Sequence, residues 1–347
     1  MEVGIWLPIF GGWLRNVEDE QMAPTFEYNR QVAQRADALG FNTILVAELN
    51  LNDIKGPHEP SLEAWTTVAA LAATTERIRL MAAIRPGFRW PAVVAKMAAN
   101  IDHISGGRLE INLVSAWWKE EMEMYLGQWL EHSERYRRSR EFVQILKGTW
   151  SEEVFNYDGE FYQLRKCVLA PKPLQRPGIP VYAGGESDEG RNLIAAECDA
   201  YLMHGDSVDA IAAAVDDMNA RRAQYSKRPL RYGMAAYVIC RDSEREAQAE
   251  LGRITQVKAD SAAQHSYKDF VTQSRLKTQI DLKDYSVSNR GLRPNFVGTP
   301  EQIVERMRAY EAVGLDLILI QCSPMLTELE RIGTQILPKL RSAIQCN

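Results

Sequence analysis

The 347-residue sequence lacks the features that mark secreted, membrane-bound or nucleic-acid-binding proteins. Its five cysteines are scattered and include no CxxC pair, so neither a disulfide framework nor a zinc site of the usual spacing is indicated. The formal net charge is only −5, which argues against binding to nucleic acid or to an anionic membrane. No apolar run reaches about 18 residues, and the amino-terminal residues have no signal-peptide pattern. We therefore expect a cytoplasmic globular protein.

Motifs of several common enzyme classes are also missing. No GxGxxG turn is present, which disfavours a doubly wound nucleotide-binding sheet. No set of His, Asp and Glu residues has the spacing of metal ligands, so no metal site is predicted. A hydrolase or metal-dependent lyase would normally display its acid, base or ligands at the active site. These absences disfavour both classes.

What the sequence does contain is a strand followed by a helix, eight times over. Short apolar runs of the kind buried on both faces alternate with segments that have helical spacing of apolar residues. The strands are predicted at 3–8, 43–47, 78–84, 109–114, 179–183, 200–204, 231–240 and 315–321. Eight such units predict an α/β fold, a single (β/α)8 TIM barrel spanning residues 1–347.

Two stretches interrupt the alternation. Residues 154–164 read as a β-hairpin that turns at Asp158-Gly159. Residues 259–295 are long, polar and weakly periodic. A stretch of that kind in a compact domain is usually an active-site loop, so we expect an insertion at the C-terminal face of the barrel that acts as a mobile lid.

Barrel enzymes place their active sites at the carboxyl ends of the strands, so the residues that follow each predicted strand are the candidates for the site. They are rich in aromatic and amide side chains, which suits a flat, partly apolar cofactor. Gly184-Gly185-Glu186-Ser187 follows a strand and opens a helix. The glycines and the free N–H groups of the helix could approach a phosphate, although an ordinary capped turn has the same pattern.

Four segments together resemble one enzyme family. They are Ser105–Arg108 with Asn112–Ser115, Leu130–Tyr136, Gly184–Asp188 and Val297–Pro300. Over nearly the whole chain the sequence resembles the bacterial-luciferase-like flavin monooxygenases, in the two-component branch of dimethyl sulfone, alkanesulfonate and pyrimidine monooxygenases. The resemblance implies reduced FMN (FMNH2) as cofactor, O2 as co-substrate and a separate NAD(P)H-dependent FMN reductase as partner. It also implies a homo-oligomer, either a dimer or a tetramer.

The resemblance implies a set of cofactor-binding residues. The residues carried over to the flavin ring and ribityl chain are Glu48, Leu49, Asn112 and Glu121, and those carried over to the phosphate are Arg135, Tyr136, Gly185 and Ser187. Their donors and acceptors suit these roles, although Arg135 could belong to a solvated helix face and Glu121 could be a surface charge. Such barrels also tend to have a non-proline cis peptide after the third strand. Ala82-Ala83 has suitable side chains, but two core alanines would look the same.

The residues that hold an anionic substrate in alkanesulfonate monooxygenases are not kept. Those enzymes have Arg and His on strand seven, where this chain has Ala235 and Tyr237, and Tyr and His after strand eight, where it has Ser323 and Met325. The remaining candidates are His58, Arg85 and Tyr237 for catalysis and Phe10, Trp117, Arg290 and Met325 for substrate contact. The two arginines could bind an anion, but a neutral substrate fits at least as well, and His58 could equally be an exposed loop residue.

We therefore predict a reduced-FMN- and O2-dependent monooxygenase of a small organosulfur compound, a sulfone or a sulfonate. One alternative is a monooxygenase of a pyrimidine, another heterocycle or an amide. Two further alternatives on the same fold are a deazaflavin-dependent oxidoreductase, which needs no O2, and a flavin-binding protein without catalytic activity.

Overall fold

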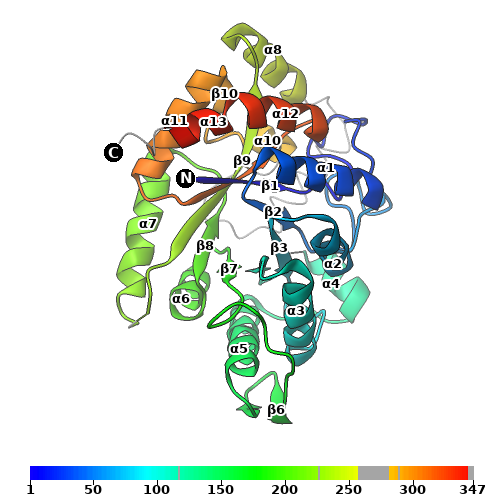
Figure 1. Ribbon diagram of the computed structural model, residues 1–347, viewed down its shortest axis with the longest axis vertical. Helices are drawn as coiled ribbons and strands as arrows, with labels where there is room; N and C mark the ends of the chain where they lie inside the picture. The colour runs from blue at the N-terminus through cyan, green and yellow to red at the C-terminus, as the bar shows by residue number, and fades with distance from the viewer. Residues whose placement is uncertain (116–117, 226, 257–280, 288–289, 343–347) are drawn as a thin grey trace.

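The computed structural model describes residues 1–115, 118–225, 227–256, 281–287 and 290–342. Eight parallel strands form a closed barrel, because the first strand pairs with the last (Figure 1). In spatial order they are β1 (Glu2–Trp6), β2 (Thr43–Val46), β3 (Arg79–Ile84), β4 (Leu109–Leu113), β7 (Val181–Ala183), β8 (Ala200–Met203), β9 (Arg231–Cys240) and β11 (Leu317–Gln321). The predicted (β/α)8 barrel is confirmed.

Helices cover the outside of the barrel. They are α1 (Phe26–Leu39), α2 (Ala64–Thr74), α3 (Pro91–Ser105), α5 (His132–Ser151), α6 (Asp188–Glu197), α7 (Val208–Arg222), α11 (Pro300–Ala312), α12 (Met325–Gln335) and α13 (Leu337–Ser342). In α1, the side chain of Thr25 caps the start of the helix and Gly40 ends it with a φ of 83°. Val32 and Ala36 are buried on one face of this helix, which packs against the barrel. None of the described helices is long and apolar enough to cross a membrane.

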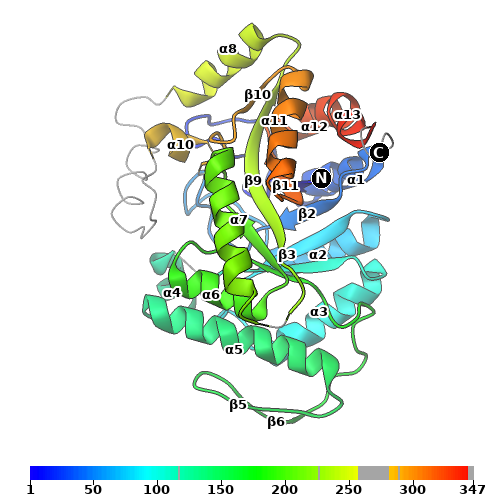
Figure 2. The same ribbon diagram turned by 90° about the vertical axis from the view of Figure 1, so that its left-hand side faces the viewer.

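Several short elements are added to this frame. They are α4 (Lys119–Leu126), α8 (Glu244–Thr255), α10 (Leu282–Ser286), β10 (Phe296–Gly298) and a hairpin of β5 (Phe155–Asp158) and β6 (Gln163–Cys167). The sequence predicted the hairpin one to three residues early and gave no sign of α4 or β10. Figure 2 shows α4 and α10 on the left, at the carboxyl ends of the strands, and both chain termini on the right.

Part of the predicted lid belongs to the body of the protein. Residues 259–280 of it lie outside the described residues, but Tyr285, Val287 and Arg290 are buried. The backbone N–H of Tyr237 on β9 donates to the carbonyl of Gly291 at 2.7 Å. These described residues therefore pack onto the carboxyl end of the barrel.

The barrel interior is a separate, small core. Its members are Leu45, Met81, Ala83, Tyr182, Ala200, Leu317 and Leu319, while Ala82 packs into the larger core that the helices cover. The two alanines thus face opposite sides of β3, as consecutive strand residues do. The expected non-proline cis peptide between them is wrong, because every cis bond in the described ranges precedes a proline.

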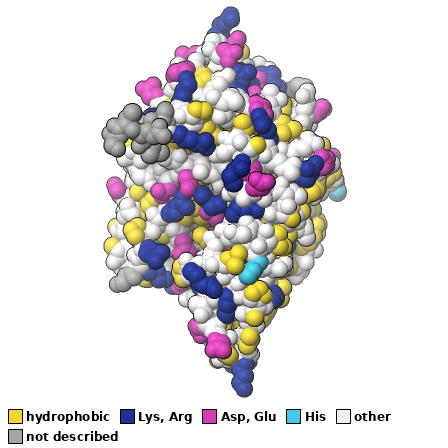
Figure 3. Space-filling model, viewed as in Figure 1, with side chains coloured by type: hydrophobic (Ala, Val, Ile, Leu, Met, Phe, Trp, Pro, Cys, Tyr) yellow, Lys and Arg dark blue, Asp and Glu magenta, His cyan; other side chains and the backbone are white. Residues whose placement is uncertain are grey.

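The amino ends of the strands are closed by a network of charges. Glu110 on β4 accepts from Thr43 at 3.0 Å and from the hydroxyl of Tyr182 at 3.4 Å, and it pairs with the Nε of Arg79 at 2.9 Å. Arg79 also pairs with Glu2. Figure 3 shows this face of the molecule, where basic and acidic side chains are interspersed.

Candidate active site

Polar side chains of several strands face the barrel interior toward its carboxyl end. Asn112 on β4 lies in register with Tyr182, and Gln321 on β11 lies in register with Tyr237 on β9. Paired residues of neighbouring strands point to the same side of a sheet, so these side chains share the barrel interior. Trp6, at the end of β1, packs against the same interior core.

These groups are left without partners in the part of the chain that the structure describes. The Oδ1 of Asn112, the Oε1 of Gln321 and the Nε1 of Trp6 are buried and form no hydrogen bond. A buried polar atom without a partner costs about 1–3 kcal/mol, so native proteins keep few of them. Two acceptors and one N–H donor inside the barrel fit the polar edge of a flavin ring, which carries both N–H and carbonyl groups. Of these three residues the resemblance identified only Asn112.

Tyr237 adds a hydroxyl to this group. Burial raises the pKa of Tyr237 well above its ordinary value, so the side chain stays protonated. It is therefore an available O–H donor beside Gln321.

A second group of predicted residues forms a cradle between α5 and α6. The hydroxyl of Tyr136 is hydrogen-bonded to the side chain of Ser187, and burial raises the pKa of this tyrosine. A Cβ added to Gly185 or Gly190 would lie 3.1–3.2 Å from the Tyr136 hydroxyl, so both glycines leave room for it. The Oγ of Ser187 also caps α6 by accepting from the N–H of Gly190 at 3.1 Å. The cradle combines a helix N-terminus with two hydroxyls, which suits a phosphate.

Two acidic side chains beside the cradle are paired with arginines. Glu186 forms an ion pair with Arg290, and Asp188 forms one with Arg221 at 2.9 Å. The charges of these two carboxylates, which would otherwise repel a phosphate, are thus compensated by arginines. Arg135 lies over the ring of Trp129 at 4.1 Å, and its charge acts on Tyr136.

The two predicted flavin carboxylates are engaged by arginines. Glu121 on α4 pairs with both terminal nitrogens of Arg85, and both side chains are at most 1% exposed. Glu48 accepts from the backbone N–H of Arg85 and pairs with Arg89. These bonds tie α4 to the loops after β2 and β3. The carboxylates therefore position the loops around the barrel mouth, where the adjacent Leu49 is buried in the core.

Comparison with known proteins decides the family. The model of the luciferase-like monooxygenase family matches residues 1–317. The chain belongs to the luciferase-like monooxygenase family. It is 37% identical over 349 aligned residues to the FMNH2-dependent dimethylsulfone monooxygenase of Pseudomonas putida, covering 98% of this chain and 95% of the relative.

Two further relatives agree with this assignment. The FMNH2-dependent dimethylsulfone monooxygenase of Pseudomonas fluorescens (strain Pf0-1) is also 37% identical, over 97% of this chain and 93% of its own. Among solved structures, a riboflavin lyase in complex with modified FMN and riboflavin superposes with a TM-score of 0.83 at 18% identity, covering 99% of this chain and 92% of that one. At that identity the structural match supports the fold alone.

The histidines of this luciferase-like monooxygenase differ in their surroundings. His58 is exposed in the loop after β2, where no hydrogen bond or ion pair connects it to another described residue. His204 directly follows β8 at the barrel mouth. Burial, assisted by the charge of Arg290, lowers the pKa of His204 to about 4. The imidazole of His204 is thus neutral near pH 7, and the role predicted for His58 stays a prediction.

Two predicted substrate residues, Phe10 and Met325, both lie near Met22. Phe10 lines a pocket of about 520 Å3 together with Met22, Tyr28 and Asn52. Met325 opens α12, and its backbone N–H points at the Sδ of Met22 at 3.3 Å. Trp117, the other aromatic candidate, lies outside the described residues.

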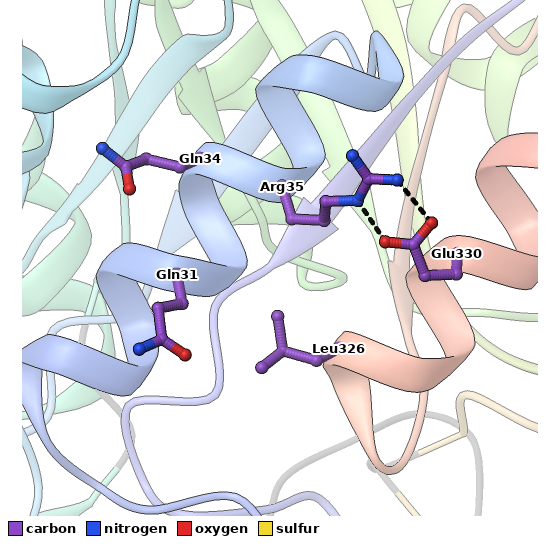
Figure 4. A pocket seen from close by; sticks show the side chains of 5 residues that line it. All are labelled: Gln31, Gln34, Arg35, Leu326 and Glu330. Atoms are coloured by element: carbon purple, nitrogen blue, oxygen red, sulfur yellow. Dashed lines mark hydrogen bonds and ion pairs between the residues drawn. The ribbon is translucent and has the colours of Figure 1, made fainter.

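Another pocket of this luciferase-like monooxygenase is unrelated to the barrel mouth. It lies between α1 and α12 on the outer surface and contains the ion pair of Arg35 and Glu330 (Figure 4). None of the predicted site residues lines it. Among the described residues, no cluster of three or more His, Cys, Asp or Glu could hold a metal ion.

Proposed function

We propose that this chain is a reduced-FMN- and O2-dependent monooxygenase of a small, uncharged organosulfur compound, with a sulfone preferred over a sulfonate. The relatives at 37% identity are FMNH2-dependent dimethylsulfone monooxygenases, which supports the cofactor and the substrate class. The observation that carries the choice of an uncharged substrate is the pairing of both candidate arginines. Arg85 is neutralised by Glu121 and Arg290 by Glu186, so neither is a free cation for a sulfonate.

The cofactor would be held at two places. Trp6, Asn112 and Gln321 would bond the polar edge of the ring with atoms that have no other partner among the described residues. Tyr136 and Ser187 would hold the phosphate at the start of α6. When bound, reduced FMN supplies the electrons that activate O2.

The remaining groups of the mouth would bind the substrate. Tyr237 stays protonated and can donate a hydrogen bond to a sulfone oxygen, which accepts but cannot donate. Phe10 and Met325 are buried apolar side chains that would exclude water from the reacting atoms. His204, neutral near pH 7, can accept a proton at the same rim.

The source of the reduced flavin is part of the proposal. The relatives at 37% identity are named for their dependence on FMNH2, so we assign NAD(P)H oxidation to a separate FMN reductase. A cytoplasmic location and a dimer or tetramer, expected from the sequence, complete the proposal.

The experiment combines the purified protein with an FMN reductase, NADH and 18O2. Dimethyl sulfone, methanesulfonate and uracil are offered in separate reactions. We expect a product that contains one 18O atom with dimethyl sulfone and little or none with methanesulfonate. Substrate oxidation without O2, with a deazaflavin in place of FMN, would favour the oxidoreductase alternative. No substrate-dependent product with any compound would contradict the proposal.

A further inference from the structure

A buried arginine outside the flavin cradle has no partner of opposite charge. Arg138 on α5 is 5% exposed, and its Nε is buried without an acceptor. Within the described ranges it forms no hydrogen bond and no ion pair. Its neighbour Arg137 is exposed and pairs with Glu160 at 2.9 Å. Because burying an unpaired charge is costly, the exception calls for a ligand of opposite charge.

The guanidinium of Arg138 lies against the loop that follows β3. A Cβ added to Gly87 would lie 2.8–2.9 Å from its Cζ and both terminal nitrogens. Gly87 has a φ of 112°, so glycine is favoured here for two reasons. The backbone of the loop thus covers one side of the guanidinium.

Tyr162, from the turn between β5 and β6, brings a second unpartnered group. The side chain is 5% exposed, and its hydroxyl is buried without a hydrogen bond in the described part of the chain. Burial raises the pKa of Tyr162 to about 12. Its ring also packs against that of Phe142, about one helical turn after Arg138 on α5, with the centroids 6.1 Å apart. The ring packs edge-on against Trp90, directly before α3, at 5.2 Å. Tyr162 therefore presents an O–H donor beside the arginine.

The carboxylate of Glu141, whose charge acts on Tyr162, is already hydrogen-bonded to the backbone. Glu141 accepts from the backbone N–H groups of Glu160 at 2.7 Å and of Tyr162 at 3.1 Å. Its charge acts on Tyr162, but it forms no ion pair with Arg138. The arginine is thus left for an external anion.

This place is separate from the cradle at α6. Successive residues of an α-helix are about 100° apart, so Tyr136 and Arg138 point in nearly opposite directions from α5. Tyr136 faces Gly185 and Gly190, whereas Arg138 faces Gly87. One helix thus presents two anion-binding side chains to two different places.

We propose that Arg138 and Tyr162 form a second oxyanion subsite, distinct from the phosphate cradle, for a small tetrahedral anion such as sulfate or phosphate. A guanidinium and a hydroxyl are the donors that such oxygens accept from. The inference does not depend on the proposed monooxygenase function. It concerns only the anion chemistry of the apoprotein.

The first test measures sulfate binding to the apoprotein by calorimetry and by the midpoint of thermal unfolding, with sodium chloride at equal ionic strength as reference. We expect saturable sulfate binding in the wild type and in the matched control R137Q. R138M should weaken binding by about 10- to 100-fold, the loss expected for a charged hydrogen bond. If Arg138 only packs against Gly87, R138M will unfold at a lower temperature with unchanged sulfate affinity, and the proposal is overturned.

A second variant keeps the test valid if R138M does not fold. Y162F removes only the hydroxyl and should weaken sulfate binding by about threefold to tenfold; unchanged affinity would overturn the role of Tyr162. Flavin competition then separates the two sources of the anion. Sulfate that stays bound at saturating FMN supports a separate subsite for a free anion. Displacement by FMN but not by riboflavin would mean that the flavin phosphate uses Arg138, and would overturn the separation.

Discussion

Buried polar groups at the two ends of the barrel interior differ in whether they have hydrogen-bond partners. At the amino end, Glu110 is bonded to Thr43, Tyr182 and Arg79. Two residues further along β4, on the same side of the strand, the Oδ1 of Asn112 has no partner among the described residues. Strand β4 thus contributes the hydrogen-bonded carboxylate of Glu110 to the amino end of the barrel and the unpartnered amide oxygen of Asn112 to the carboxyl end.

This difference indicates that the polar groups at the amino end stabilise the fold, whereas the unpartnered polar atoms at the carboxyl end bind a ligand. Buried polar groups that are fully hydrogen-bonded make the fold rigid and specific. A buried polar group without a partner in the protein is expected mainly at a functional site, where a ligand can supply the hydrogen bond. We expect substitutions at the amino end to change the free energy of unfolding and substitutions of the unpartnered atoms at the carboxyl end to change ligand affinity. The paired charges at the carboxyl end should behave like those at the amino end.

The largest effect is expected for the buried pair of Arg85 and Glu121. E121Q leaves the charge of Arg85 buried and uncompensated, so the free energy of unfolding should fall by about 3–5 kcal/mol. Urea unfolding measures the change. The control E123Q alters an exposed pair on the same helix and should change stability by less than about 1 kcal/mol. Equal effects of the two substitutions would contradict the role assigned to the buried pair.

His204 should make stability depend on pH. Its pKa is about 4 in the folded state, against an ordinary value of 6.5, so between these values the unfolded chain binds the proton and the folded chain does not. The wild type should therefore lose unfolding free energy as the pH falls from 6.5 to 4, by on the order of 2 kcal/mol relative to H204Q. Parallel pH profiles of the two proteins would disprove this. H58Q, in an exposed loop, serves as the control.

Asn112 and Glu110 test the comparison within one strand. N112L removes an unpartnered acceptor, so the apoprotein should be no less stable, while the dissociation constant for reduced FMN should rise about tenfold. E110Q should do the reverse, with lower stability and unchanged flavin affinity. Anaerobic flavin titration and urea unfolding of both variants provide the four values. A lower free energy of unfolding in N112L would contradict the assignment of Asn112 to ligand binding rather than to stability.

The smallest effect concerns the cradle. Y136F removes the hydroxyl that is bonded to Ser187, and we expect about fivefold weaker binding of FMN. Riboflavin, which has no phosphate, should bind Y136F and the wild type equally. A similar loss for both flavins would mean that Tyr136 contacts the ring rather than the phosphate.

The sequence predicted the barrel well because its strands are buried on both faces and read as apolar runs. Strand β9 was placed at its observed limits, 231–240. Two elements were missed because they are short and depend on tertiary contacts: α4 starts without a side-chain cap, and β10 exists only by pairing with β9.

The site was predicted less completely. The residue types of the cradle could be carried over from the resemblance, but the partners of charged groups could not. Glu121 meets Arg85 and Glu186 meets Arg290 only through the fold, and neither periodicity nor spacing along the chain specifies such pairs. That Trp6 and Gln321 have unpartnered polar atoms could not be predicted either, because an unpartnered atom is defined by what surrounds it.

The closure of the barrel has a consequence for how the chain folds. Residue Glu2 of β1 lies opposite Leu317 of β11, so the first barrel strand along the described chain pairs with the last barrel strand. Contacts between such distant segments form slowly, since the intervening chain must be ordered first. Until β11 emerges, the edge of β1 remains unpaired and open to association with other chains. We expect a chain that ends before Leu317 to aggregate during synthesis, however complete its flavin-binding residues are.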